Sequence, residues 1–161
     1  MSERVLLLSI KPEYANLIFA GTKRVELRRV RPQLSRGDRI MIYVTAPVRA
    51  LWAAVTVDRV VEAKPSALWA LVKGDAGLSR KQFDDYFRGA TTGYAIFLTG
   101  AALLARPVGL DMLRALWGRF HPPRSHIYLS WEQLECVEGL PDGVLARRDR
   151  GSLAPGSGRA H

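Results

Sequence analysis

The sequence predicts an α+β fold, a small mixed β-barrel with flanking and inserted helices. Segments with strand-like patterns alternate with short helical patterns, an arrangement typical of this class. The chain has 161 residues, of which 48% are hydrophobic, so it can bury the core of one domain and would be cramped as two. No internal repeat is present, and the alternation therefore does not indicate a solenoid.

The chain opens with a strand, a helix and a second strand. The apolar run Val5–Ile10 is typical of a buried strand. A proline then opens a helix at residues 12–20, where its missing N–H is tolerated, and Gly21 stands where a C-terminal cap is expected. Val25 and Leu27 alternate with charged residues, the period of two expected of a strand with one polar face.

The middle of the chain alternates strands with inserted helices. Gly37 and Asp38 end a loop rich in arginine and proline and lead into the next strand. Ser79 and Gln82 form the capping-box pattern that marks the start of a helix. The expected elements are strands at residues 40–44 and 48–61, the second long and bent, and helices at residues 65–72 and 79–88.

The remaining elements are short and end before the C-terminus. Ser130 and Gln133 repeat the capping-box pattern. The expected elements are a strand from residue 93 to 105, a helix from 110 to 120, a strand from 127 to 129, and a last helix after Ser130. Residues 140–161 are too polar and too small to bury. We therefore expect a domain at residues 1–139 and a basic, disordered tail at residues 140–161.

The charge of the chain indicates the class of partner. The formal net charge is +9 at pH 7, and a positive surface attracts polyanions because phosphate releases counterions on binding. This favours RNA or DNA, although a compositional surplus of arginine remains an alternative. Cys136 is the single cysteine, which excludes an intramolecular disulfide and favours a cytoplasmic location. No apolar stretch spans a membrane, and no metal-binding motif appears, so neither a membrane partner, a metal nor a cofactor is expected.

One segment resembles a known family. GTKRVELR at residues 21–28 follows the pattern GxKxxExR, directly after the helix that SIKP at residues 9–12 begins. Together with Gly37-Asp38, YVTAP at residues 43–47 and PPRS at residues 122–125, this pattern resembles the ASCH domain, the activating signal cointegrator homology family. The resemblance covers roughly residues 5–135. It implies a PUA-like barrel with a cleft beside the motif that holds RNA or a modified nucleoside.

The resemblance leaves several activities open, because a fold does not choose among functions. Members of the family resemble nucleic-acid-binding coregulators, a single-strand-specific ribonuclease, and an amidohydrolase that deacetylates acetylated cytidine. We expect a nucleic-acid or modified-nucleoside binding protein, with a regulatory role as one form, and a small hydrolase as the alternative. A protein-interaction adaptor is a third possibility. Glu26 stands where the amidohydrolase members carry a threonine, which disfavours the deacetylase.

The candidate site is centred on the motif. Strand alternation places Arg24, Glu26 and Arg28 on one face, and Lys23 at the strand start is expected to swing freely into the cleft. A surface ladder of opposite charges is the structural alternative. The nucleic-acid-binding candidates are Lys11, Lys23, Glu26, Arg28, Tyr43, Arg49 and Ser125; in an enzyme, the catalytic candidates are Lys23, Glu26, Tyr43 and Ser125.

Each candidate has an expected role. Arg28, with Lys23, would bind phosphate or polarise a carbonyl, and Glu26 would orient these cations or accept hydrogen bonds from a base edge. Tyr43 would stack a base, place its hydroxyl near phosphate, or belong to the core. Arg49 would add a cation, and Ser125 would lie near the cleft. His121 and His126 flank the double proline at a spacing that fits neither a helix face nor a strand face, and we expect no role for them. The tryptophans and the cysteine are expected in the core: Trp52, Trp69, Trp117, Trp131 and Cys136.

Overall fold

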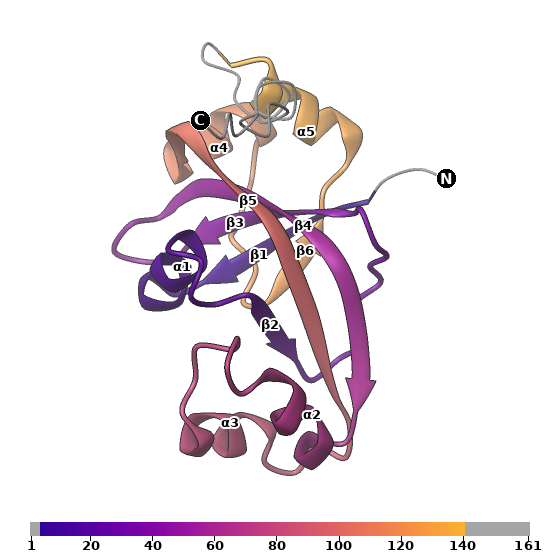
Figure 1. Ribbon diagram of the computed structural model, residues 1–161. Helices are drawn as coiled ribbons and strands as arrows, with labels where there is room; N and C mark the ends of the chain where they lie inside the picture. The colour runs from indigo at the N-terminus through magenta and orange to yellow at the C-terminus, as the bar shows by residue number, and fades with distance from the viewer. Residues whose placement is uncertain (1–3, 141–161) are drawn as a thin grey trace, which may run out of the picture.

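The computed structural model describes residues 4–140 and confirms the α+β class (Figure 1). The elements in chain order are β1 (Val5–Ile10), α1 (Pro12–Phe19), β2 (Val25–Arg28), β3 (Arg39–Val44), β4 (Ala50–Ala63), α2 (Pro65–Val72), α3 (Arg80–Phe87), β5 (Gly93–Gly109), α4 (Leu110–Trp117), β6 (His126–Tyr128) and α5 (Trp131–Glu138). The strands form one sheet in the order β2-β5-β4-β3-β1-β6. In Figure 1, α4 and α5 lie at one end of the sheet, and α2 and α3 lie at the other.

The expected elements are all present, and most of their boundaries differ by one to four residues. β5 runs on to Gly109 because its far end pairs with the start of β4, Ala50 opposite Gly109. α4 ends at Trp117 because Gly118 has φ +75° and breaks the helix. β6 begins one residue earlier than expected, at His126, which pairs with Leu8 of β1. Register shifts along the β4–β5 pairing agree with the long, bent strand expected there.

Three clusters of buried side chains form the core of the described residues. Alternate residues of β1 point to opposite faces of the sheet, as the period of two requires. Leu7 packs in the cluster that contains Leu113 of α4, whereas Leu8 packs with Ile18 of α1. The third cluster joins β2, α2 and α3 and includes Val25 and Phe83. The third cluster therefore fixes the inserted helices against the strand that carries the charged motif.

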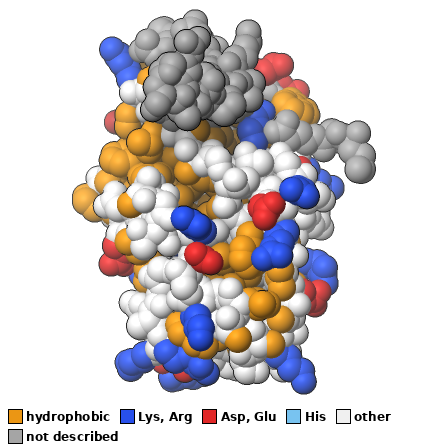
Figure 2. Space-filling view, viewed as in Figure 1, with side chains coloured by type: hydrophobic (Ala, Val, Ile, Leu, Met, Phe, Trp, Pro, Cys, Tyr) orange, Lys and Arg blue, Asp and Glu red, His pale blue; other side chains and the backbone are white. Residues whose placement is uncertain are grey.

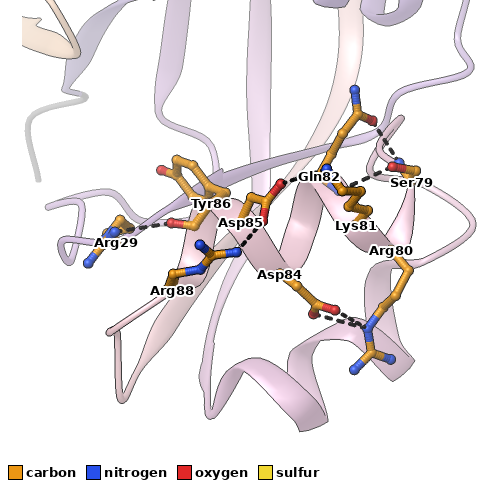
Figure 3. Close-up of polar contacts among 9 residues, drawn as sticks. All are labelled: Arg29, Ser79, Arg80, Lys81, Gln82, Asp84, Asp85, Tyr86 and Arg88. Atoms are coloured by element: carbon orange, nitrogen blue, oxygen red, sulfur yellow. Dashed lines mark hydrogen bonds and ion pairs between the residues drawn. The ribbon is translucent and has the colours of Figure 1, made fainter.

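Both predicted capping boxes are present. In α3, Ser79 Oγ accepts a hydrogen bond from Gln82 N at 3.1 Å, and Gln82 Oε1 accepts one from Ser79 N at 2.9 Å (Figure 3). The same reciprocal pair joins Ser130 and Gln133 at the start of α5. Gly21 has φ +79° just after α1, as expected of a C-terminal cap.

Two residues expected in the core are exposed. Trp131 has 51% of its surface accessible, and Cys136 is also exposed. Both lie on α5, which buries only Leu134 and Val137 against the sheet. None of the helices within residues 4–140 has the length and apolar character needed to cross a bilayer. The expected tail from residue 141 onward lies outside the described residues, so its order stays a prediction.

Candidate nucleic-acid site

A cavity of about 320 Å³ lies beside β2. Its floor is the end of β1 and the strand β2, and α1 and α3 provide its walls. Four of the seven candidate residues line it, Lys11, Lys23, Glu26 and Arg28, together with Ser9, Ile10, Tyr14, Leu27, Leu78, Gln82 and Tyr86. The charged motif therefore faces a cavity rather than open solvent.

Glu26 lies between two cations. Its carboxylate oxygens are 3.8 Å from Lys23 Nζ and 3.7 Å from Arg28 Nη2. All three side chains are largely withdrawn from water, with 4%, 15% and 13% of the surfaces of Lys23, Glu26 and Arg28 exposed. Two cations around one carboxylate leave a net positive charge in a site of reduced dielectric, where a bound anion is attracted more strongly than at an exposed surface.

Lys23 is fixed, which corrects the expectation that it swings freely. Its Nζ donates a hydrogen bond to Ala76 O at 2.5 Å and lies 5.7 Å from the ring centroid of Tyr14. Its backbone N–H is also held, because it donates to Leu17 O at the end of α1. Burial lowers the pKa of Lys23 below its usual value, and the neighbouring carboxylate of Glu26 opposes this shift in part.

Arg28 joins the two edges of the sheet. β2 and β6 lie at opposite ends of the strand order, so in a flat sheet they would be roughly 24 Å apart at the usual strand spacing. Arg28 Nη1 nevertheless donates a hydrogen bond to Ser125 Oγ, just before β6, at 2.8 Å. The sheet is therefore curled into a half-barrel, and its edges meet at the cavity.

The Arg28 guanidinium keeps a donor available. Its Nε is buried, and no described residue accepts a hydrogen bond from it. A buried donor without an acceptor costs free energy. An anionic or carbonyl ligand would remove that cost if the side chain turned Nε toward the cavity.

Ser125 continues the contact to a histidine. Ser125 Oγ lies 3.3 Å from His126 Nδ1. Since Arg28 already donates to this hydroxyl, the hydroxyl proton is available for Nδ1. Burial, and after it the charge of Arg28, lowers the pKa of His126. The lowered pKa favours the neutral form of His126, in which one ring nitrogen can accept a proton.

Helix α3 supplies the wall opposite the motif. Tyr86 donates from its hydroxyl to Leu27 O at 3.1 Å. Its carbonyl accepts a hydrogen bond from Arg29 Nη1 at 3.1 Å, which Figure 3 shows. Both contacts hold α3 against β2. Burial is the main cause that raises the pKa of Tyr86, so this hydroxyl stays protonated. Tyr14 and Tyr86 thus give the cavity two aromatic side chains, and Gln82 gives it an amide.

The exposed charges of α3 have partners on the same helix. Figure 2 shows lysine and arginine side chains gathered at the end of the molecule where Figure 1 draws α2 and α3. There Asp84 pairs with Arg80 at 3.0 Å, and Asp85 pairs with Arg88 at 2.6 Å (Figure 3). Exposed pairs of this kind contribute little to stability. They also weaken the electrostatic attraction between this surface and an anion.

Tyr43 and Arg49 do not line the cavity. Tyr43 is 2% exposed, and its ring packs against Phe120 with centroids 6.5 Å apart. Burial raises its pKa, and the charges of Arg49 and Arg114 oppose that shift. Arg49 is exposed in the turn before β4. Tyr43 is connected to the cavity only through Ser9, which lines the cavity and is the register partner of Tyr43.

The ASCH domain model matches residues 8–96, which is more than half of the chain. The chain belongs to the ASCH domain family. A protein of Zymomonas mobilis named as an ASCH domain-containing ribonuclease is 33% identical over 137 residues, covering 85% of this chain and 92% of that protein. The crystal structure of ASCH from Zymomonas mobilis has a TM-score of 0.80 and 32% identity, covering 84% of this chain and 94% of that one.

More distant structures share the fold alone. The N-terminal domain of Staphylothermus marinus McrB superposes with a TM-score of 0.53 at 12% identity, covering 88% of this chain and 99% of that one. The half-barrel with its helices is thus the PUA-like architecture expected from the sequence, carried by proteins with little sequence in common.

Several residues that line the cavity of this ASCH domain were not predicted from the sequence. Ser9 belongs to an apolar strand, and Tyr14 has the spacing of a core helix residue. Gln82 was recognised only as a cap and Tyr86 only as one aromatic of α3. Nothing local marks them, because the contact that brings Tyr86 to Leu27 spans 59 positions. No group of histidine, cysteine or carboxylate side chains suited to a metal ion occurs within residues 4–140.

Proposed function

We propose that this ASCH domain protein binds single-stranded RNA and holds one nucleotide in the cavity beside β2. The observation that carries the proposal is Arg28, whose guanidinium lies at the meeting point of the two sheet edges with Nε lacking an acceptor among the described residues. Guanidinium groups bind phosphate through several directed donors. A phosphodiester in the cavity would bind the guanidinium, and it would accept the hydrogen bond that Nε lacks once the side chain turns this buried atom toward the cavity.

The rest of the lining suits a base. RNA sequence is read mainly on unstacked bases, through aromatic stacking and hydrogen bonds to base edges. Tyr14 and Tyr86 offer the rings, and Glu26 and Gln82 offer an acceptor and a donor near them. Lys11 at the mouth adds an exposed cation for the neighbouring phosphate. An RNA ligand also fits the cytoplasmic location expected from the single cysteine.

The experiment is a fluorescence anisotropy titration of labelled single-stranded RNA with Arg28→Met. We expect the affinity to fall about 10-fold or more, because a hydrogen bond to a charged group contributes about 1.5–3 kcal/mol. The slope of log Kd against log salt should also decrease by about 0.7 for the lost phosphate contact. Arg80→Met on the outer side of α3 removes the same charge and should change neither quantity. If the two variants weaken binding equally, RNA is attracted only non-specifically by the positive charge of the protein, and the proposed site is wrong.

A ribonuclease is the second candidate, favoured by the name of the Zymomonas mobilis relative and its 33% identity. Cleavage through the 2′-hydroxyl needs a base and a cation for the developing phosphorane. His126 lies next to Ser125 and its lowered pKa favours the neutral form, and Arg28 is the adjacent cation. Lys23, with its lowered pKa, is a second candidate base.

The solved structures of the relative include a tyrosine-to-phenylalanine mutant and a serine-to-alanine mutant. This chain places residues of the same two types beside Ser9. Tyr43 is the register partner of Ser9, and Ser125 O accepts the hydrogen bond from Ser9 N at 3.1 Å. We therefore propose Ser125 as a direct contact of the RNA and Tyr43 as a residue that positions the strand behind it.

Cleavage is tested on end-labelled single-stranded RNA with and without a chelator. A ribonuclease of the proposed kind shortens the RNA in both conditions and leaves a strand of the same sequence with 2′-deoxyriboses intact. Intact RNA under conditions where the anisotropy assay shows binding would restrict the protein to binding. Acetylated cytidine in the same reaction tests the amidohydrolase, which is disfavoured because Glu26 offers no hydroxyl nucleophile.

A further inference from the structure

A second, smaller cavity lies along β6 at the other edge of the sheet. It has a volume of about 210 Å³ and is lined by Arg4, Val5, Tyr128, Leu129, Ser130, Trp131 and Leu134. Two of these are aromatic side chains that reach the surface, since Tyr128 is 39% exposed and Trp131 is 51% exposed. Large aromatic side chains in such a position, beside a cation, are typical of surfaces that stack bases.

The aromatic surface is held in place before any ligand binds. Tyr128 OH accepts a hydrogen bond from Gln33 N at 2.8 Å, and Gln33 Oε1 accepts one from Arg4 Nη1 at 2.7 Å. The Arg4 guanidinium carbon lies 5.9 Å from the centroid of the Tyr128 ring. Trp131 is the first residue of α5, directly after the capping box of Ser130. The ring of Tyr128 and the guanidinium of Arg4 thus lose little freedom on binding.

A series of side-chain contacts connects the lining of the second cavity with that of the first. The ring of Tyr128 lies 5.7 Å from the ring of His126, edge to face. His126 in turn contacts Ser125, which accepts the hydrogen bond from Arg28. A row of side chains therefore leads from the charged cavity, along β6, to Trp131. β6 is an edge strand that pairs only with β1 among the described strands.

We propose that the second cavity is a subsite for the base of a neighbouring nucleotide in the same RNA strand, stacked on Trp131 and Tyr128. The inference rests on the proposed function and extends it. The lining favours a base over a phosphate, because it offers two aromatic side chains for stacking and the single cation Arg4. A phosphate of the connecting backbone would then pass Ser125, where Arg28 lies. The strand is thereby bound at two points rather than one.

The subsite makes the effect of Trp131 depend on RNA length. The probes are a single nucleoside monophosphate, which fills only the first cavity, and an RNA of about eight nucleotides, within the range that single-stranded binding domains cover. Trp131→Ala should weaken binding of the longer RNA by about 5- to 20-fold, the lower part of the range for one stacked base. Binding of the mononucleotide should be unchanged. Trp131→Phe should restore much of the affinity for the longer RNA.

An abasic nucleotide provides the decisive comparison. A series of the longer RNA is made with a single base removed at successive positions. At the position that enters the second cavity, removal of the base should weaken the wild type and leave Trp131→Ala unaffected. Leu71→Ala, at an apolar residue that is 56% exposed on α2, is the matched control and should bind like the wild type.

The outcomes separate this inference from the proposed function. If Arg28→Met weakens both probes while Trp131→Ala weakens neither, the first cavity binds RNA and the second subsite is disproved. If neither variant changes binding of either probe, the proposed function itself has failed. A loss on Trp131→Ala that is equal at every abasic position overturns the subsite, because the tryptophan then acts on the fold. Capture of a protein by this surface, without any Trp131 effect on RNA, also overturns it.

Discussion

Arg28 Nη1 and Ser125 Oγ are 2.8 Å apart although 97 positions separate the two residues. Arg28 ends one edge strand of the sheet and Ser125 precedes the other. Their contact marks the place where the half-barrel comes nearest to closing. The candidate site is therefore assembled only when the whole sheet has curled, and it should be lost together with the tertiary structure.

The Arg28–Ser125 contact predicts coupling between the two side chains. Ser125→Ala should weaken RNA binding about 2- to 10-fold, the effect of one hydrogen bond. In the double variant with Arg28→Met, Ser125→Ala should have a smaller effect than in the wild type, because the part of its effect that acts through Arg28 is already gone. Anisotropy titrations of the four proteins measure the cycle. Effects that simply add would contradict a functional contact between the two residues.

Burial of Lys23 predicts a specific pH dependence of stability. The pKa of Lys23 is lowered from 10.5, mainly because burial disfavours the ammonium. Between that lowered value and 10.5 the unfolded chain binds a proton that the folded chain does not, so raising the pH stabilises the folded state. Urea unfolding of the wild type and Lys23→Met, measured in parallel, should show the wild type gaining free energy of unfolding relative to the variant as the pH rises. A difference that stays constant with pH would show that Lys23 is not desolvated.

His126 should respond to a change at Arg28. Burial first, and the charge of Arg28 second, lower the pKa of His126 from 6.5. Arg28→Met should therefore raise this pKa toward 6.5 without reaching it, whereas Arg28→Lys, which keeps the charge, should shift it less. An NMR titration of the His126 ring proton measures the three values. Because the pKa of His126 is lowered in the folded chain, the unfolded chain binds the proton first as the pH falls through 6.5. The free energy of unfolding of the wild type therefore falls in this pH range, and that of Arg28→Met should fall by less.

Gly93 sets the position of the wall formed by α3. A Cβ at Gly93 would lie 2.6 Å from Phe87 Cε1 and 2.9 Å from Leu68 Cδ2. Gly93→Ala should lower the free energy of unfolding by about 1–3 kcal/mol, as overpacking does in a filled core. Gly74→Ala, where a Cβ meets nothing within 4 Å, should change it by less than about 0.5 kcal/mol. Thermal unfolding of both variants checks the difference. Equal free energies of unfolding for the two variants would mean that α3 moves to accommodate the added methyl group without loss of stability.

Much of the fold could be predicted from local patterns. The alternation of Val25 and Leu27 with Glu26 and Arg28 gave the correct polar face because β2 is an edge strand with one buried side. Ser79 and Ser130 marked their helices correctly because a capping box depends only on residues three positions apart. The boundary of β5 at Gly109 was missed because it is fixed by pairing with β4, a distant strand.

The candidate site was predictable only where its contacts are local. Glu26 and Arg28 share a strand, so their neighbourhood follows from the period of two. Lys23 was expected to be free, yet it is held by Ala76 O, 53 positions away. Tyr43 could be placed on a strand from the sequence, but its burial could not be predicted, because that burial depends on Phe120 and α4. His126 gained its significance only through Ser125 and Arg28.

The most direct test of the proposed RNA site is an NMR titration that follows the Arg28 side-chain Nε–H signal while single-stranded RNA is added. This group is buried and lacks a described acceptor in the free protein, so a ligand that turns Nε toward the cavity and accepts its hydrogen bond changes its signal. We predict a shift whose midpoint matches the Kd from anisotropy, with the Arg80 signal unchanged. An Arg28 signal that stays constant while RNA binds, or a shift confined to Arg80, would contradict the site.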